Sequence, residues 1–491
     1  MRRKPKNPPA NPAPSEVDVL IIGGGVTGIS LAALMAQNKS LLLLEKRDFA
    51  SGTSQASGMM VWGGLLYLKN FEFRLVWKYC RARDRMIGRQ NGQVTKRKFT
   101  YMMQKKGGRS RVFVWLALQV YQAFSLWKRA RLKSFRPENL DANFNPNMFS
   151  NGWTYEEGFL TESDARFALL QLQRENEKAH VANYQEVTSI RSQDDGGFQV
   201  DYQDTITGQK MQTRVGKIIN CGGVWAEEIN LNFGISTEHT HYLSKGVYLL
   251  LPASACTDAI IMDMEDHDDT LCWVPWGEVV MWGPTETKID SLEEAVATYE
   301  DIDFLLDSLN RVSQKTWRRD DILNVRCGVR PLVNKPGKSV KYPLDLSRRA
   351  VVEKSPDRDW WTVFGGKLSG AADLAATIHR TIFPDEPIQN SSPDPETPPP
   401  PITKKYFLGR ELPEPSYCRE FEHCRTLEDY LRRRTNIAQW IPNSGFGKNY
   451  EFQKDLIAIA GVLLDDDGSA VDEVQAYREK VTAEKKQWNE R

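Results

Sequence analysis

A glycine-rich turn between two apolar strands near the start of the chain restricts the fold more than any other feature. The segment 18–32 reads DVLIIGGGVTGISLA, in which a β-rich apolar run enters a turn and small and aliphatic residues continue as a helix. A second apolar run, 41–44, then ends on an acid, Glu45. This order of strand, glycine turn, helix, strand and acid is the layout of a dinucleotide-binding βαβ unit. The sequence therefore predicts an α/β domain that binds a dinucleotide.

Each conspicuous residue of this unit has an expected task. Gly23 makes the tight turn, Gly25 lets the backbone approach a pyrophosphate, and Gly28 allows the helix to pack closely on the strand. The phosphates would lie at the helix N-terminus, near Thr27, where unpaired N–H groups and the helix dipole favour an anion. Glu45 follows Gly23 by 22 residues, where an acid can accept hydrogen bonds from a ribose hydroxyl. We expect these five residues to bind the cofactor.

Composition excludes several other classes of protein. A length of 491 residues predicts two or three domains, and a hydrophobic content of 41% is enough for buried cores. A net charge of +1 without a basic motif argues against a nucleic-acid-binding protein. Seven scattered cysteines lack ligand spacing, which favours reduced thiols in a cytoplasm and argues against a metal site. Residues 1–15 are basic and proline-rich and predict a disordered arm rather than a signal peptide.

The residues after the second strand resemble a known family. The run EKRDFASGTS, residues 45–54, matches a motif of the FAD-dependent glycerol-3-phosphate dehydrogenases, which belong to the D-amino-acid-oxidase-like flavoproteins. Further matches follow in the family's order: DARFALL (164–170), NCGGVWAEEI (220–229), KGVYLLLP (245–252), VPWGEVVMWGPTET (274–287), GVRPL (328–332), DLSRRAVV (345–352), FGGKLS (364–369) and EDYLRRRTN (428–436). The resemblance implies FAD as the cofactor, quinone as the electron acceptor and attachment to a membrane surface.

Together, pattern and resemblance predict an α/β fold with three parts. These are a Rossmann-type FAD-binding domain (16–68, 159–234 and 350–383), a discontinuous α+β substrate domain (69–158 and 235–349) and a C-terminal helical domain (403–491). A proline-rich linker, 388–402, precedes the helical domain. A β-hairpin is expected at Gly277–Glu278. The arginine run 432–434 predicts a solvated or interdomain face, with an acidic lipid or partner as the alternative.

The matching motifs also imply the residues of the site. Cofactor contacts are implied for Lys46, Gly52, Thr53, Ser54, Gly222, Gly223, Gly366, Lys367 and Leu368. Arg330, Lys367 and either Arg348 or Arg349 match family positions that contact substrate and flavin, and such cations suit an anionic substrate. For Arg330 an interdomain salt bridge is the alternative, and for the pair Arg348–Arg349 simple solvation. Tyr67 matches a tyrosine near the substrate, or is a packed core residue.

The chain departs from the family at three motifs, one of which is residues 369–372, where SGAA stands in place of Thr-Thr-Tyr-Arg. In VWGGLLY, Trp62 stands where the family has histidine and Leu66 where it has arginine. In KGVY, Tyr248 stands in place of a second histidine. Histidine is the side chain best suited to accept a proton near neutral pH, so the remaining candidates are Lys245, Tyr248 and Lys367. A pocket lined by Trp62 would suit a larger or less anionic substrate.

Three functions therefore remain open. In the first, Lys367, Arg330, Tyr67 and Tyr248 form the catalytic site of an FAD enzyme that oxidises a polyol phosphate, sn-glycerol 3-phosphate to dihydroxyacetone phosphate, and passes electrons to quinone. In the second, the same superfamily frame oxidises another hydroxy acid, amine or amino acid. In the third, the chain is a non-catalytic FAD-binding protein at a membrane surface.

One further segment bears on localisation. Residues 112–127 read VFVWLALQVYQAFSLW between basic flanks. As a helix it would be about 24 Å long, too short to cross a hydrocarbon layer of about 30 Å. The basic flanks and terminal tryptophans suit a helix lying in an anionic membrane interface, and a core helix of the substrate domain is the alternative. Gln119, Gln122 and Ser125 form a thin polar stripe. We expect a cytoplasmic protein, placed on the cytoplasmic membrane if this helix binds lipid.

Overall fold

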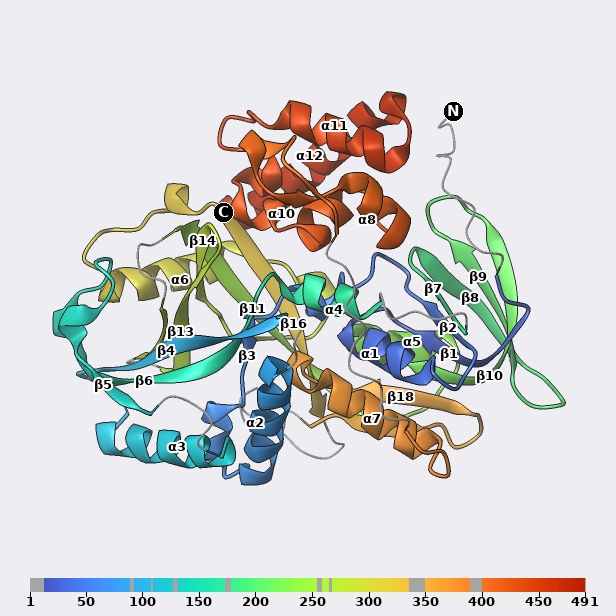
Figure 1. Ribbon diagram of the computed structural model, residues 1–491, viewed down its shortest axis with the longest axis horizontal. Helices are drawn as coiled ribbons and strands as arrows, with labels where there is room; N and C mark the ends of the chain where they lie inside the picture. The colour runs from blue at the N-terminus through green and yellow to red at the C-terminus, as the bar shows by residue number, and fades with distance from the viewer. Residues whose placement is uncertain are drawn as a thin grey trace.

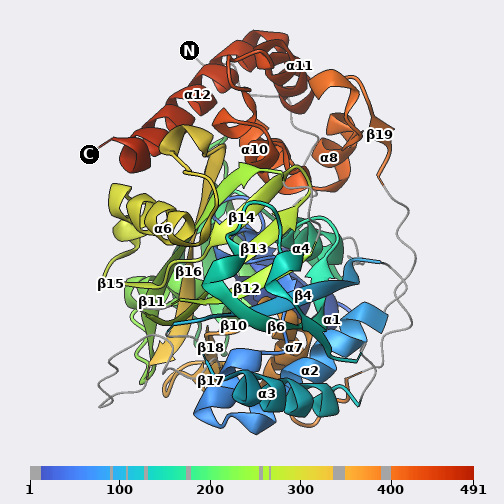
Figure 2. The ribbon, with the colours of Figure 1, turned by 90° about the vertical axis from the view of Figure 1, so that its left-hand side faces the viewer.

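Figure 1 shows the computed structural model of the chain, which describes residues 13–88, 92–106, 109–126, 131–172, 178–253, 258–264, 267–334, 349–388 and 400–490. Two β-sheets lie side by side, and a helical domain covers one end of the molecule (Figure 1, Figure 2). Arg348, residues 1–12 of the predicted arm and residues 389–399 of the predicted linker lie outside the described residues.

The first sheet is built around the predicted βαβ unit. Its strands are β1 (Glu16–Ile22), β2 (Leu41–Leu44), β7 (Ala179–Ala182), β8 (Gln185–Ser192), β9 (Phe198–Asp204), β10 (Lys210–Asn220), β17 (Val351–Lys354) and β18 (Trp360–Phe364). The order is β17-β18-β10-β1-β2-β7, and β9 joins β8 to β10. The pairs of β1 with β2 and β10 are parallel. Such a sheet is covered on both faces, which explains why β1 and β2 are continuous apolar runs. The predicted α/β class is confirmed.

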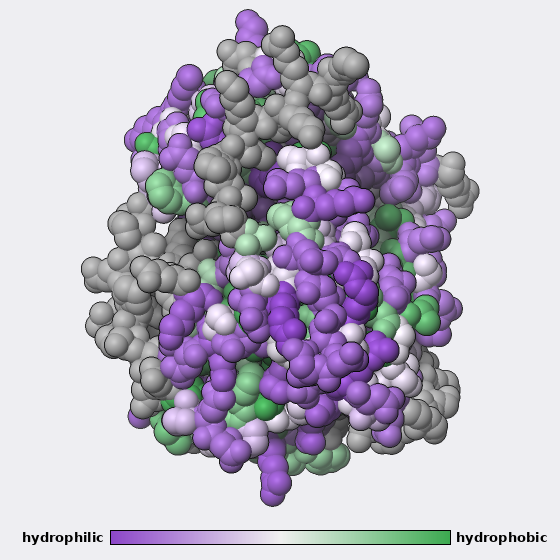
Figure 3. Space-filling model, turned by 90° about the vertical axis from the view of Figure 1, so that its right-hand side faces the viewer, coloured by the Kyte–Doolittle hydropathy of each residue, from purple (hydrophilic) through white to green (hydrophobic). Residues whose placement is uncertain are grey.

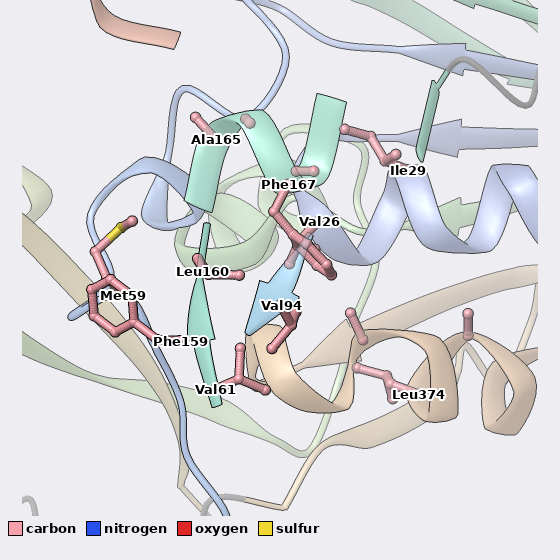
Figure 4. Packing of buried hydrophobic residues seen from close by; sticks show 14 of the residues in the cluster. Val26, Ile29, Met59, Val61, Val94, Phe159, Leu160, Ala165, Phe167 and Leu374 are labelled. Carbon is pink, nitrogen blue, oxygen red and sulfur yellow. The ribbon is translucent and has the colours of Figure 1, made fainter. Parts of the chain in front are cut away.

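Helices cover this sheet and bury its apolar faces. They are α1 (Val26–Met35), α4 (Asp164–Leu172), α5 (Ala226–Asn232) and α7 (Ala371–Ile382). Ile29 of α1 is fully buried and belongs to one cluster of buried residues with Phe167 of α4 and Leu374 of α7, part of which Figure 4 shows. A Cβ on Gly28 would lie 2.0 Å from the carbonyl oxygen of Gly23. Only glycine therefore lets α1 start so close to the turn.

The second sheet carries the remaining large strands. They are β3 (Met60–Val61), β4 (Val94–Gln104), β5 (Lys133–Phe135), β6 (Phe149–Leu160), β11 (Thr240–Pro252), β12 (Ala259–Met264), β13 (His267–Trp276), β14 (Val279–Gly283), β15 (Thr287–Ile289) and β16 (Asn324–Asn334). The order is β15-β11-β14-β13-β12-β4-β6-β3, with β16 paired to β11 and β5 to β6. The predicted hairpin at Gly277–Glu278 is confirmed as β13–β14. Helix α6 (Tyr299–Val312) packs on one face.

Two surface helices, α2 (Phe73–Gly88) and α3 (Arg111–Phe124), lie together beside the second sheet (Figure 1, Figure 2). Arg83 of α2 is buried and donates hydrogen bonds to Ser125, to the hydroxyl of Tyr121 and to Glu157. These bonds draw the polar side of α3 toward the protein, so that Gln122 is only 4% exposed. The buried face of α3 also carries the apolar residues Val114 and Leu118, whereas Val112, Phe113, Trp115, Leu116, Val120 and Leu126 are exposed. The helix therefore packs one face on the core and leaves a second apolar face at the surface.

The C-terminal part forms a helical domain with its own core. It contains α8 (Pro415–Phe421), α9 (Leu427–Asp429), a π-helical turn η11 (Tyr430–Arg434), α10 (Ile437–Trp440), α11 (Gln453–Leu464), α12 (Asp467–Asn489) and a small ladder of β19 (Ile402–Thr403) with β20 (Leu412–Pro413). Leu431, Leu456 and Ile459 are fully buried in that core. Among the described residues, we find no helix with the length and apolar character that crossing a bilayer requires.

Candidate cofactor and substrate site

A cavity of about 560 Å³ extends from the first sheet to the second. At one end it is lined by Gly23 and Glu45, which follow the carboxyl ends of β1 and β2. At the other it is lined by Tyr248 of β11 and Arg330 of β16. Ligands of parallel α/β sheets bind beyond the carboxyl ends of the strands, so this is the expected position for a dinucleotide that reaches toward a substrate.

Nearly all residues expected to contact the cofactor line this cavity. They are Gly23, Gly25, Thr27, Glu45, Lys46, Gly52, Thr53, Ser54, Gly222, Gly223, Gly366, Lys367 and Leu368. The exception is Gly28, which is buried in α1 below the turn. The fold thus brings together segments that are more than three hundred residues apart in sequence.

The geometry around the glycine turn suits a dinucleotide. A Cβ on Gly25 would lie 3.3 Å from the hydroxyl oxygen of Ser54, so a larger residue would fill the space between the turn and the facing loop. The same hydroxyl accepts a hydrogen bond of 2.9 Å from the amide of Val26, the first residue of α1. An anion here would face the N-terminus of a helix, where amides are available and the dipole is favourable.

Glu45 is held in place by the backbone around it. Its carboxylate accepts hydrogen bonds from the amides of Gly24, at 2.7 Å, and Arg47, at 2.9 Å. Burial raises the pKa of the Glu45 carboxyl, and these two hydrogen bonds only partly oppose that effect. The side chain is therefore a fixed acceptor at the cavity wall, as a ribose-binding acid requires.

At the opposite end, Lys367 lies among aromatic rings. Its Nζ donates a hydrogen bond of 3.0 Å to the carbonyl oxygen of Trp62. The same atom is 5.9 Å from the ring centroid of Trp62, 5.4 Å from that of Tyr67 and 5.0 Å from that of Tyr79. A cation over aromatic faces is stabilised by the ring quadrupoles. Trp62, Tyr67 and Lys367 all line the cavity.

Arg330 lies beside a carboxylate of its own sheet. Its Nη1 is 3.2 Å from the hydroxyl of Ser244 and 3.4 Å from Oε2 of Glu286, and Ser244 donates to Glu286 at 2.6 Å. Arg330 and Glu286 both line the cavity. Among the described residues Arg330 thus pairs with Glu286, which lies between β14 and β15 of the same sheet, and the interdomain salt bridge considered from sequence stays a prediction.

Alternation along β11 separates two residues considered as proton acceptors. Tyr248 faces the cavity, whereas Lys245 is buried on the side of α6, where its Nζ is 2.7 Å from Asp301 and 3.1 Å from the carbonyl oxygen of Val296. Because side chains of a strand alternate between faces, odd-numbered residues such as Lys245 point away from the cavity. The prediction that Lys245 could accept the substrate proton is therefore wrong, because Lys245 forms a buried ion pair with Asp301 outside the cavity.

Sequence reasoning missed five charged residues of the cavity wall: Arg47, Arg109, Glu186, Glu228 and Glu286. Arg109 follows β4 and is held by Asp263 and by the hydroxyl of Tyr101, at 2.8 Å. It stands in the basic run before residue 112, which the sequence alone associates with lipid. Arg349, which was considered from sequence as an alternative to Arg348, lines the cavity. Glu286 lies in the matched segment 274–287, which assigned no role to a single residue.

Comparison with known proteins identifies the class. Residues 18–372 match the profile of the FAD dependent oxidoreductase family, and the chain belongs to that family. The computed fold is similar to that of the glycerol-3-phosphate dehydrogenase from Bacillus halodurans complexed with FAD, with a TM-score of 0.71, 17% identity and coverage of 96% of this chain and 95% of that one. Similarity to the L-α-glycerophosphate oxidase of Mycoplasma pneumoniae with FAD bound has a TM-score of 0.58, with 17% identity over 77% of this chain and 97% of that one.

Two curated relatives are more similar in sequence. The D-erythritol 1-phosphate dehydrogenase of Brucella abortus is 30% identical over 386 residues, which are 76% of this chain and 75% of that protein. The aerobic glycerol-3-phosphate dehydrogenase of Staphylococcus haemolyticus is 29% identical over 375 residues, 74% of this chain. The match spans 66% of the length of the staphylococcal protein. The predicted family, fold class and FAD cofactor are confirmed, and the chain is an FAD-dependent oxidoreductase of the glycerol-3-phosphate dehydrogenase type.

Proposed function

We propose that the protein oxidises the secondary hydroxyl of a small polyol phosphate, converting sn-glycerol 3-phosphate to dihydroxyacetone phosphate or a four-carbon analogue to its ketone. The observation that carries this proposal is the set of cations that line the cofactor cavity, among them Lys367, Arg330 and Arg109. A phosphate is best held by such groups, and arginine provides a bidentate fork. The names of the two curated relatives, which refer to glycerol 3-phosphate and D-erythritol 1-phosphate, support the same substrate class.

Within this proposal each residue has a defined task. FAD, when bound, supplies the acceptor for the hydride that leaves the substrate carbon. Arg330 binds the phosphate, and Lys367 stabilises negative charge on the hydroxyl oxygen, whose proton is released to solvent as the hydroxyl becomes a ketone. The rings of Trp62 and Tyr67 exclude water, which strengthens these charge interactions. Tyr248 lines the same cavity and orients the hydroxyl through a hydrogen bond.

A second candidate is favoured by Glu286. A carboxylate 3.4 Å from Arg330 offsets the positive charge that a phosphate needs, and it offers an acceptor for an ammonium group. Trp62 and Leu66 add an apolar wall where the family has a histidine and an arginine. An amino acid, an amine or another hydroxy acid would suit this arrangement. A non-catalytic protein would instead bind FAD, and none of the polyol phosphates, amino acids, amines or hydroxy acids would reduce it.

Anaerobic flavin bleaching of the purified protein separates these functions. Glycerol 3-phosphate, D-erythritol 1-phosphate, glycerol, hydroxy acids and amino acids would be mixed one by one with the FAD-loaded protein. Reduction by a polyol phosphate, and not by glycerol, is the expected result. Bleaching only by an amino or hydroxy acid would support the second candidate, and no bleaching by any compound would support a non-catalytic protein.

The electron acceptor and the membrane are part of the proposal. An apolar surface, here called the α2/α3 patch, contains exposed Phe71, Phe73, Trp77, Val112, Phe113, Trp115, Leu116, Val120 and Leu126. Phe71 is 78% exposed and Phe113 54%. By contrast, the opposite face of the molecule, seen in Figure 3, is largely hydrophilic. Exposed Arg74, Lys78 and Arg111 border the patch. A surface of this kind fits an anionic membrane, where electrons would pass to quinone.

A further inference from the structure

The arginine run of the C-terminal domain reaches into the FAD-binding domain. Arg433 and Arg434 of η11 both donate to the carboxylate of Asp48, and all three side chains are almost fully buried. Asp48 also accepts a hydrogen bond of 2.8 Å from Asn183. Burial by itself raises the pKa of Asp48, but the charges of Arg434 and Arg433 outweigh it and hold the pKa below its usual value. The carboxylate is therefore ionised and paired at neutral pH.

Asp48 begins the loop that lines the cofactor cavity. Ser51, Gly52, Thr53 and Ser54 of this loop form part of the cavity wall. The far side of the loop, away from the cavity, is held by Gln55 of the short helix η1 (Thr53–Gln55). Its side-chain nitrogen donates to the carbonyl oxygen of Ser51 at 2.5 Å. The loop is thus folded onto itself behind the residues that face the cofactor.

The C-terminal domain contacts the same Gln55. Arg433 donates to its side-chain oxygen, and Arg432 donates to its carbonyl oxygen, each at 3.1 Å. At the end of the loop, Arg326 donates to the carbonyl oxygen of Ser57 at 3.0 Å and also bonds Gln439 of α10. The loop is therefore bonded to the C-terminal domain at its beginning and middle, and its end is linked to that domain through Arg326 of β16.

We infer that the C-terminal domain sets the affinity for FAD by holding this loop, with Arg433, Arg434 and Asp48 as positioning residues. None of the three arginine-run side chains lines the cavity, so the effect passes through the loop. Removing one partner of a charge pair buried this deeply strongly destabilises the local structure, because the other charge stays buried without its partner. The inference depends on FAD being the cofactor and is independent of which substrate is oxidised.

The test measures FAD binding rather than turnover. Apoprotein of the full chain would be titrated with FAD, and flavin fluorescence would give the dissociation constant for wild type, Arg434→Gln and Asp48→Asn. We expect both variants to bind FAD at least ten-fold more weakly. With FAD saturating, the rate of flavin reduction by substrate in Arg434→Gln should equal that of wild type. Hydrogen exchange of residues 48–57 should be faster in both variants.

The matched control is Arg410→Gln. Arg410 forms an ion pair with Glu278 in the β13–β14 turn, so it also joins the C-terminal domain to the rest of the chain, but away from the loop. Its FAD dissociation constant should stay within two-fold of wild type. An unchanged constant in folded Arg434→Gln, or an equal loss in Arg410→Gln, would overturn the inference. If Arg434→Gln does not fold, Gln55→Ala decides, because unchanged FAD affinity in that variant would also overturn it.

Discussion

The Nζ atom of Lys367 donates a hydrogen bond of 3.0 Å to the main-chain carbonyl oxygen of Trp62. This contact joins the turn after β18 to the segment after β3, so the ammonium group is fixed where the two sheets meet. The ring of Trp62 lies 5.9 Å from the same Nζ. Trp62 therefore contributes both a main-chain acceptor and an aromatic ring to the surroundings of the Lys367 ammonium group.

Replacing Lys367 should separate flavin binding from flavin reduction. In Lys367→Met, we expect FAD to remain bound while the rate of anaerobic flavin reduction falls by about 10²-fold or more, the loss typical of one preorganised charge. Stopped-flow absorbance would measure this rate. Lys404→Met, which removes an exposed lysine paired with Glu411 in the C-terminal domain, should reduce at the wild-type rate. A wild-type rate of flavin reduction in Lys367→Met would contradict a role for Lys367 in the reaction.

Replacing Arg330 should weaken an anionic substrate selectively. A hydrogen bond to a charged group contributes about 1.5–3 kcal/mol, so Arg330→Met should raise the KM for a polyol phosphate by about 10–100-fold. Steady-state kinetics would show this change with FAD content unaltered. Arg191→Met alters an exposed arginine of β8 that pairs with Asp201 of β9, and this variant should leave KM unchanged. An equal KM in Arg330→Met and wild type would contradict phosphate binding at Arg330.

Closing the space at Gly25 should prevent cofactor binding. In Gly25→Val the side chain would occupy the gap to Ser54, where a Cβ alone lies 3.3 Å from the hydroxyl oxygen. We expect the purified variant to contain no FAD by absorbance while its circular dichroism stays folded. The control is Gly88→Val at the end of α2, where a Cβ meets nothing within 4 Å. Stoichiometric FAD in purified Gly25→Val would contradict the assignment of this glycine turn as the cofactor-binding site.

The affinity for FAD should depend on the ionisation of Glu45. Burial raises the pKa of this carboxyl above its usual 4.5. In the apoprotein, folding therefore favours the protonated carboxyl, so the protonated carboxyl contributes to the free energy of unfolding at low pH. This contribution is lost as the pH rises through the raised pKa. Ribose binding needs the ionised acceptor, so FAD affinity should fall as the pH drops through the same value, before an ordinary glutamate would titrate.

Fluorescence titrations with FAD from neutral to mildly acidic pH would measure this dependence. Glu45→Gln should bind FAD more weakly at neutral pH and should lose the acidic fall in affinity. The idea fails if wild type and Glu45→Gln follow the same pH profile.

The α2/α3 patch predicts binding to anionic vesicles. Burying a large apolar side chain contributes about 1.5–3 kcal/mol, so the double variant Phe113→Ser, Leu116→Ser should lower vesicle binding by at least ten-fold in a sedimentation assay. Ile206→Ser changes an exposed apolar residue outside the patch and should bind like wild type. Equal binding of both variants would show that this patch does not contact lipid.

Much of the fold could be predicted because its signals are local. The glycine turn, the acid after β2 and the hairpin at Gly277–Glu278 each depend on residues close in sequence, whose backbone preferences restrict the chain before any tertiary contact forms. Motif matches extended this to the cofactor. Glu45 and Gly25 were placed at the cavity on such grounds, and the structure has both in its wall.

Tertiary structure alone decided which charged side chains share a space. Glu286 lies beside Arg330, and Lys245 forms an ion pair with Asp301. Arg434 pairs with Asp48, from which it is separated by 386 positions in the sequence. The free energy of a charge depends on burial and on the partners that the fold brings to it, and neither is encoded by neighbouring residues. The orientation of α3 was decided in the same way, because its buried face places the hydroxyls of Tyr121 and Ser125 against buried Arg83. Local sequence thus determined the elements and the cofactor turn, whereas long-range packing determined the chemistry of the substrate end.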